Sequence, residues 1–201
     1  MSDYAVAVIA PNDNNVSGVV HFIQQGKKLH IDYSIKGLSD GEHGFHIHEY
    51  GDLTDGCESA CAHFNPDGKE HGGLTSKVSH LGDLGNIDSK DDLAEGRITT
   101  ESISLIMGEK NCILGRMIIV HADRDDLGLG GDEESLKTGN AGKRLGCGVI
   151  GLQEPPELKK SETAEPKKID ILDLMITIGF CLMGAYGGYH YVAPNLLDSN
   201  E

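Results

Sequence analysis

The chain has 201 residues, a length that fits one domain of ordinary size with an extension. Its net charge of -15 argues against a general nucleic-acid surface, because phosphate groups would be repelled. The 27 glycines lie between short apolar runs and aromatic residues are few, which favours an all-β sandwich or barrel over a helical bundle.

The expected strands follow one another as short runs bounded by turn residues. Residues 28–36 give the clearest pattern, because every second residue from Leu29 to Ile35 is apolar, as in a half-buried strand. The other predicted strands cover residues 4–10, 16–24, 42–49, 85–88, 96–102, 112–120 (with Arg116 inside it) and 145–152. Residues 50–83 and 123–143 are predicted to be long polar loops, which are uncommon unless they are functional.

A histidine pair in the fourth predicted strand is the first candidate site. His46 and His48 are two residues apart, and side chains at i and i+2 of a strand point to the same face. Both rings can therefore reach one point, and neutral imidazole is the commonest side-chain metal ligand. A strand with two surface histidines is the simpler alternative.

Further potential ligands follow in the chain. They are His63, His71, His80, Asp83 and, further on, His121. Imidazoles with one carboxylate suit zinc, and an all-imidazole set suits copper as well as zinc. The sequence therefore predicts a metal site organised by the first long loop.

These residues lie within motifs that resemble the copper/zinc superoxide dismutase family. The motifs cover residues 44–52, 56–57, 63–66, 71–73, 80–86, 121–128 and 139–151, and the match runs from about residue 4 to residue 153. The resemblance implies an eight-stranded antiparallel Greek-key β-barrel of immunoglobulin-like architecture. It also implies that superoxide anion is converted to dioxygen and hydrogen peroxide by a copper centre bridged through a histidine to a structural zinc.

The resemblance assigns roles to individual residues. It places copper on His46, His48, His63 and His121, and zinc on His63, His71, His80 and Asp83, so that His63 bridges the metals. Asp125 would hydrogen-bond His46 and His71 and fix the orientation of both rings. Arg144 joins His63 as a catalytic residue, because a guanidinium offers fixed donors to a small anion such as superoxide.

The resemblance also covers the second long loop and two cysteines. Glu133, Glu134 and Lys137 would guide the anion electrostatically, with Thr138 in the channel wall. Cys57 and Cys147 match the intrasubunit disulfide of the family. Cys61 stands where the family usually has glycine. It is either a small loop residue or a thiol that exchanges with Cys57 or contacts a metal.

The sequence divides into residues 1–153, a superoxide dismutase domain; 154–168, a charged Pro-containing linker; and 169–201, an apolar tail. No charged residue occurs from Leu174 to Leu197, a length that could span a bilayer, so the tail is a candidate membrane anchor. A packing helix or a disordered tail is the alternative. The first residues show no secretory signal, which predicts a cytoplasmic location with tethering by the tail as a second option.

The expected partners follow from the resemblance. We expect a homodimer, with Gly51, Leu114, Gly151 and Leu152 at the positions of dimer contacts, and a copper chaperone as a further partner. We expect no nucleic acid. Two rival functions are a non-enzymatic copper-binding or copper-delivery protein and a tethered structural protein. The full ligand set and Arg144 favour the enzyme.

Overall fold

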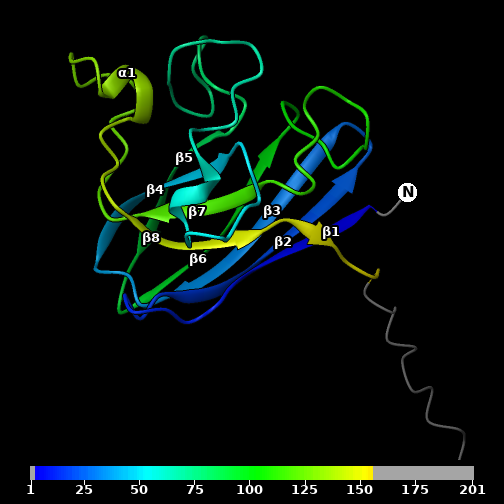
Figure 1. The fold of residues 1–201 in the computed structure, drawn as a ribbon, viewed down its shortest axis with the longest axis horizontal. Coiled ribbons are helices and arrows are strands. Elements are labelled where there is room, and N and C mark those ends of the chain that lie inside the picture. The colour runs from blue at the N-terminus through cyan, green and yellow to red at the C-terminus, as the bar shows by residue number, and fades with distance from the viewer. Residues whose placement is uncertain (1–2, 156–201) are drawn as a thin grey trace, which may run out of the picture. The chain divides into compact units, whose positions relative to one another are not determined.

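The structure is a computed structural model that describes residues 3–155 (Figure 1). The linker from residue 156 onward and the predicted tail, residues 169–201, lie outside the described residues, so the division at residue 153 stays a prediction. Within residues 3–155 no helix has the length and apolar character needed to cross a membrane.

Residues 3–155 contain nine strand segments, which form two antiparallel sheets. The strands are β1 Tyr4–Ile9, β2 Ser17–Gln25, β3 Lys28–Lys36, β4 Gly41–His48, β5 Asp83–Ser89, β6 Leu93–Thr100, β7 Met117–His121, β8 Arg144–Val149 and β9 Gly151–Leu152. One sheet has the order β6-β3-β2-β1-β9 and the other the order β5-β4-β7-β8. Strands distant in sequence thus lie side by side, as in Greek-key folds, and the predicted all-β sandwich is confirmed.

Apolar side chains from both sheets fill the space between them. Phe22 and Ile31 come from the first sheet and Phe45 and Ile118 from the second, and all four are fully buried. Because side chains alternate along a strand, the core-facing Phe45 and Ile47 place the even-numbered residues of β4 on the opposite face. The histidine pair of β4 therefore points away from the apolar core.

The predicted strand at residues 112–120 is wrong in its first half. Strand β7 begins only at Met117, because the preceding residues turn: Cys112 N donates to Glu109 O and Arg116 N donates to Ile113 O. Arg116 therefore lies outside the strand. Its guanidinium stacks 3.5 Å from the centroid of the Phe64 ring, on the first long loop.

The predicted strand at residues 145–152 is also not continuous. Ile150 interrupts this strand, and the N–H of Ile150 donates to Arg116 O, just before β7. Before this break β8 pairs with β7, and after it β9 pairs with β1 in the other sheet. The last stretch of the domain thus passes from one sheet to the other.

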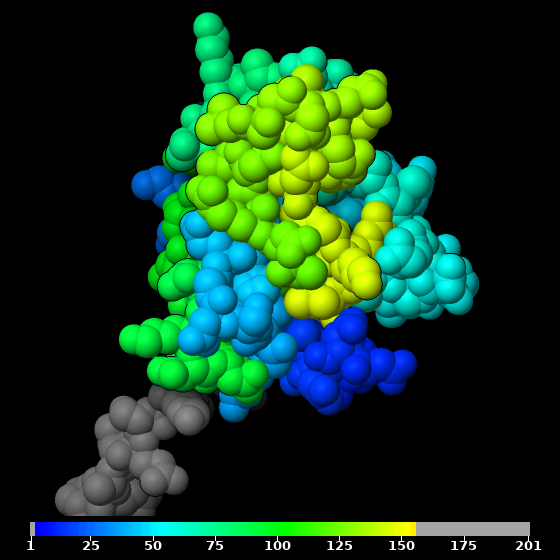
Figure 2. Space-filling view, turned by 90° about the vertical axis from the view of Figure 1, so that its left-hand side faces the viewer, coloured from blue at the N-terminus to red at the C-terminus, as the bar shows by residue number. Residues whose placement is uncertain are grey.

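The two long loops stand on the upper side of the domain in Figure 1. The first contains the short 3-10 helix η1 Glu58–Ala60 and the second the single-turn helix α1 Ser135–Thr138. A disulfide joins Cys57 of the first loop to Cys147 of β8, with the Cα atoms 5.7 Å apart, which confirms the predicted pairing. Figure 2 shows the second loop, in yellow-green, capping the upper part of one face of the molecule.

Candidate metal centre

Strands β4 and β7 bring three histidines together. His46 and His48 occupy the outward face of β4, and β7, its neighbour in the sheet, ends at His121. The Nε2 atoms of His48 and His121 lie 3.3 Å apart. The first long loop adds His63, whose backbone forms an isolated bridge with His48.

Potential ligands in the described chain gather in three groups: two share His63, and the third is His46 and His71 with Asp125. Of the two that share His63, the first group is His46, His48, His63 and His121, and the second is His63, His71, His80 and Asp83. All of these residues are buried, and within each group one ligand atom per residue lies within 4.8 Å of the others. The structure thus brings all of the predicted ligands together within these two groups.

In the first ligand group, the rings of His48 and His121 each have one nitrogen hydrogen-bonded to a backbone carbonyl. His48 Nδ1 lies 2.8 Å from Cys61 O, and His121 Nδ1 lies 3.2 Å from Gly142 O. A carbonyl oxygen can only accept, so these nitrogens carry the hydrogen. The Nε2 atoms of both rings therefore keep the lone pair that a metal needs.

The carboxylate of Asp125 also holds one nitrogen on each of two further rings. Its Oδ2 lies 2.8 Å from His46 Nε2 and its Oδ1 lies 2.8 Å from His71 Nε2, so one carboxylate holds a ring from each group. The other nitrogen of each ring is buried: His46 Nδ1 has no hydrogen-bond partner, and His71 Nδ1 lies 3.0 Å from Asp83 Oδ1 in a geometry that makes no hydrogen bond. Buried polar atoms normally have a partner, and a bound metal would supply it at both.

The carboxylate of Asp83 completes the second group. Its Oδ1 lies 2.9 Å from His63 Nδ1, 3.0 Å from His71 Nδ1 and 3.2 Å from His80 Nδ1. Its Oδ2 accepts from the backbone N–H of Gly72 and of His80, which fixes the carboxylate. Three imidazoles with one carboxylate match zinc, and four imidazoles match copper. The residues present therefore fit both metals.

Burial keeps the rings of His48, His63 and His121 neutral. Burial lowers the pKa of His63 to about 3, and burial also lowers the pKa of His48 and His121 far below the usual range. His71 differs: burial acts to lower its pKa, but the hydrogen bond that it donates to Asp125 and the nearby carboxylate of Asp83 raise this pKa to about 9. Burial acts to raise the pKa of Asp83, and its histidine partners outweigh burial and hold it far below the usual value.

These shifts predict the pH dependence of the metal-free protein. Below pH 6.5 the unfolded chain binds protons that the folded His63 refuses down to about pH 3, so the free energy of unfolding falls on acidification, by about 1.4 kcal/mol per pH unit and proton. His71 acts in the opposite sense, because its raised pKa stabilises the fold below pH 6.5 and this contribution is lost towards pH 9. Urea unfolding at a series of pH values should show the largest free energy of unfolding near neutral pH. A free energy of unfolding that stays constant below pH 6.5 would contradict the lowered pKa of His63.

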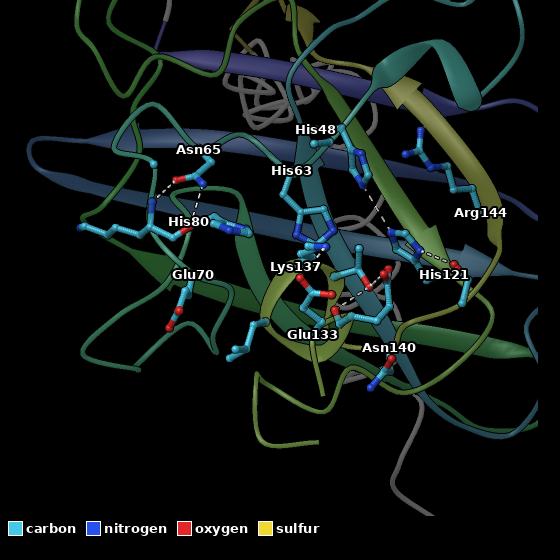
Figure 3. A pocket seen from close by; sticks show the side chains of 17 residues that line it. His48, His63, Asn65, Glu70, His80, His121, Glu133, Lys137, Asn140 and Arg144 are labelled. Carbon is cyan, nitrogen blue, oxygen red and sulfur yellow. Dashed lines mark hydrogen bonds and ion pairs between the residues drawn. The ribbon is translucent and has the colours of Figure 1, made fainter. Parts of the chain in front are cut away.

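A cavity of about 830 Å³ gives access to the first ligand group. Figure 3 shows the rings of His48, His63 and His121 on its inner wall, with Arg144 at one side. The residues predicted to guide the anion, Glu133, Glu134, Lys137 and Thr138, all line the same cavity. Lys137 Nζ lies 3.6 Å from Glu133 Oε1, and Thr138 Oγ1 donates to Glu134 Oε1 at 2.8 Å.

Backbone carbonyls of the first loop fix the Arg144 side chain. Its Nη1 donates to Cys57 O and its Nη2 to Cys61 O, each at 2.6 Å. Cys57 is also the disulfide partner of Cys147 in β8, the strand that begins with Arg144. The guanidinium is thus fixed against the cavity wall by the same loop that orients His48.

Sequence reasoning assigned no role to Asn86. Its Nδ2 donates to Asp125 O at 2.9 Å, and its Oδ1 accepts from Asp125 N at 2.7 Å, so it fixes the backbone of Asp125. The signal available was its place at the end of the motif at residues 80–86. The carbonyls of Cys61 and Gly142 gave no signal, since every residue has a carbonyl.

Cys61 adopts a backbone conformation that favours glycine. Its φ of 64° and ψ of -145° lie near a region populated almost only by glycine, and its exposed thiol is free. We predict that Cys61→Gly raises the free energy of unfolding of the metal-free protein by about 1 kcal/mol, since relief of strain exceeds the entropy cost of glycine. Thermal unfolding measures this. Cys61→Ser, which keeps a side chain, is the control and should show no gain.

Comparison with known proteins agrees with this geometry. A family model described as copper/zinc superoxide dismutase matches residues 16–150. A Cu-Zn superoxide dismutase of Paramecium bursaria Chlorella virus 1 is 54% identical over 147 residues, covering 73% of this chain and 78% of the relative. Superoxide dismutase [Cu-Zn] A of Xenopus laevis is 52% identical over 149 residues, covering 74% and 97%.

A solved structure shows the same fold. The crystal structure of the clock protein EA4 superposes with a TM-score of 0.71 at 40% identity, covering 76% of this chain and 96% of that one. The fold, the two ligand groups and these relatives agree. The chain belongs to the copper/zinc superoxide dismutase family, and it is an enzyme that converts superoxide to dioxygen and hydrogen peroxide with copper and zinc as cofactors.

Proposed function

We propose how this chain divides the two metals and the catalytic work among its residues. Copper binds His46, His48, His63 and His121; zinc binds His63, His71, His80 and Asp83. The main support is the pattern of protein hydrogen bonds, which occupy one nitrogen of His46, His48, His71 and His121 and leave the other free for a metal. Bound copper would supply one-electron redox chemistry, and zinc a redox-inert positive charge.

His63 is the residue placed to serve both metals. Its Nδ1 faces Asp83, so its Nε2 is the atom left for the first ligand group and the cavity. We assign to this Nε2 the uptake of a proton from solvent and its transfer to the superoxide that is reduced to hydrogen peroxide. Asp125 and the carbonyls of Cys61 and Gly142 keep the neighbouring rings oriented throughout.

The experiment that tests this assignment pairs metal analysis with superoxide decay on purified full-length protein. We expect close to one copper and one zinc per chain, with rapid decay that is lost when copper is removed and regained when it is restored. His121→Ala should lose copper and keep zinc, whereas His80→Ala should weaken zinc first. Loss of the wrong metal in either variant would refute the division of ligands.

Arg144 is proposed to dock superoxide beside the copper ligands. We predict that Arg144→Ala lowers the superoxide rate by about 10-fold and weakens its dependence on salt, because a fixed cation at the cavity wall is removed. Stopped-flow decay at several ionic strengths measures both effects. Metal content should be unchanged. Arg124→Ala is the control, because Arg124 pairs with Glu42 and does not line the cavity; equal effects of the two changes would remove Arg144 from the mechanism.

The charged residues of the second loop are proposed to steer the anion. Glu133, Glu134 and Lys137 line the cavity together with Thr138, so their charges contribute to the field inside it. The ion pair between Lys137 and Glu133 is exposed, so solvent screens it and salt should weaken the guidance. Replacing Lys137 with Gln should therefore lower the rate at low salt more than at high salt.

Assembly and location are proposals as well. We propose a homodimer that uses Gly51, Leu114, Gly151 and Leu152; Leu152 is 59% exposed, which is high for a large apolar side chain. Sedimentation analysis decides between monomer and dimer. A copper chaperone is a proposed partner, and copper loading in cells lacking such a protein tests it.

We propose a cytoplasmic location, with the tail at 169–201 as a membrane tether, although a relative from Brugia pahangi is named an extracellular enzyme. Fractionation and membrane flotation of the full chain, with a chain ending at Gln153 as control, test both parts. Full-length protein that stays in the soluble fraction without detergent would refute the tether.

A further inference from the structure

The second ligand group meets the cavity at two of its four residues. Of this group, His63 and His80 line the cavity. The ligand atoms gather round one point, since His63 Nδ1 and His80 Nδ1 lie 2.9 Å and 3.2 Å from Asp83 Oδ1. A metal that reaches this point from the cavity therefore passes between or beside these two rings.

The other two residues of the group are covered by protein. Asp83 Oδ2 accepts from the backbone N–H of Gly72 and of His80. His71 Nε2 lies 2.8 Å from Asp125 Oδ1. His71 is 3% exposed and Asp83 2% exposed. The described chain thus leaves the cavity as the approach from solvent to the second ligand group.

The cavity has two sides, and the ring of His63 lies between them. Figure 3 shows His80 and Glu70 on one side of this ring, which we call the His80 side. It shows His121 and Arg144 on the opposite side. The two ligand groups can therefore be reached separately from one cavity.

The glutamate carboxylates that line the cavity differ in their partners. Glu133 pairs with Lys137, and Glu134 accepts from the hydroxyl of Thr138. Within the described part of the chain, no hydrogen bond or ion pair holds the carboxylate of Glu70. Its negative charge is thus available to a cation that enters the cavity.

The backbone before Glu70 is fixed. Asn65 Nδ2 donates to Lys69 O at 2.9 Å, and Asn65 Oδ1 accepts from Lys69 N at 3.0 Å, shown as the dashed lines beside Asn65 in Figure 3. The ammonium of Lys69 pairs with Asp67, with Nζ 3.3 Å from Oδ2. Glu70 is therefore an exposed, unpaired carboxylate on a fixed backbone.

We propose that Glu70 is a transient ligand through which zinc enters and leaves the second ligand group from the His80 side. The proposal rests on the assignment of zinc to that group made above. A hydrated zinc ion loses water before it binds buried imidazoles, and taking a charge out of water is costly. Carboxylate oxygen is a zinc ligand, so Glu70 can replace one water and hold the ion until His80 binds it.

The rates of zinc association and release test the proposal on the full-length protein. A group that binds the ion only during its passage lowers the barrier in both directions, so loss of this group slows both rates. We expect Glu70→Gln to slow zinc association with copper-loaded, zinc-free protein by about 5-fold, measured with a zinc-sensitive dye in a stopped-flow instrument. Zinc release from the fully loaded enzyme, trapped by excess chelator, should slow by the same factor. Zinc affinity should change by less than about 2-fold, because an exposed charge acts weakly on a buried ion.

Glu134→Gln is the matched control for this change. It removes the same charge from the same cavity, but from a carboxylate that already accepts from Thr138. It should slow zinc association by less than about 2-fold. Glu70→Asp keeps a carboxylate and should restore most of the rate. Equal slowing in E70Q and E134Q would show a general effect of charge and would overturn the proposal.

Other roles of Glu70 predict different rates. A structural role, or a place in the final zinc site, would make zinc release faster in E70Q and weaken the affinity, and this result would also overturn the proposal. Copper association with zinc-loaded protein should be unchanged in E70Q, since His121 lies across the cavity from Glu70. The His80→Ala variant described above tests the assignment of zinc separately, because it measures affinity and involves no rate.

Discussion

Asp125→Asn is expected to weaken both metal sites, by about 10- to 100-fold in affinity for each. The carboxylate accepts from His46 Nε2 and from His71 Nε2, each at 2.8 Å, and an amide offers one oxygen and one N–H₂ group in place of two acceptors. One of the two rings must then face a donor, so it turns away or changes tautomer and loses its inward lone pair. Metal competition with graded chelators measures the two affinities separately.

Asp126→Asn is the matched control for this change. Asp126 is the next residue, and its carboxylate accepts from Ser135 Oγ, Gly128 N and Asn140 Nδ2. It should disturb the second long loop and the superoxide rate while leaving metal affinity within about 3-fold. Equal losses of metal in both variants would mean that Asp125 acts by holding the loop and not by orienting the two rings.

Cys147→Ser is expected to lower the free energy of unfolding by about 4.5 kcal/mol, because the disulfide closes a span of 90 residues in the unfolded chain. The bond also anchors the loop whose carbonyls hold Arg144 and His48. A lower superoxide rate should accompany the lower stability. Urea unfolding of the metal-free protein and superoxide decay of the loaded enzyme measure the two effects.

Cys57→Ser should reproduce this loss, and the double variant should cost little more, since both changes break one bond. Cys112→Ser is the control, because Cys112 is a free, partly buried cysteine outside the disulfide. Disulfide mapping of the wild type should find only the Cys57–Cys147 link. A Cys57–Cys61 link would show that the free thiol exchanges with the disulfide.

Strand positions could be predicted where side-chain alternation is strong. Residues 28–36 alternate throughout, and β3 has those same bounds. The run at residues 112–120 is as apolar as a strand, yet backbone hydrogen bonds near Gly115 turn its first half away from the sheet. At Ile150 the apolar pattern continues while the pairing partner changes from β7 to β1. The pattern of apolar residues indicates which side chains are buried, but it does not indicate which strand pairs with which.

The site shows the same limit. The pairing of His46 with His48 follows from strand geometry, and the motif resemblance brings in the ligands from the loops. The groups that orient these rings are partly backbone carbonyls, those of Cys61 and Gly142, whose position depends on loop conformation alone. Glu70 was also missed, because the sequence does not show whether the side chain of a loop glutamate lines a cavity.

The position of Asp125 between His46 and His71, together with the sharing of His63, has a thermodynamic consequence. Two sites that depend on the same side chains are linked, and linkage is reciprocal. If bound zinc raises the affinity for copper by some factor, bound copper must raise the affinity for zinc by the same factor. The order in which copper and zinc bind therefore does not change the total free energy of binding both metals.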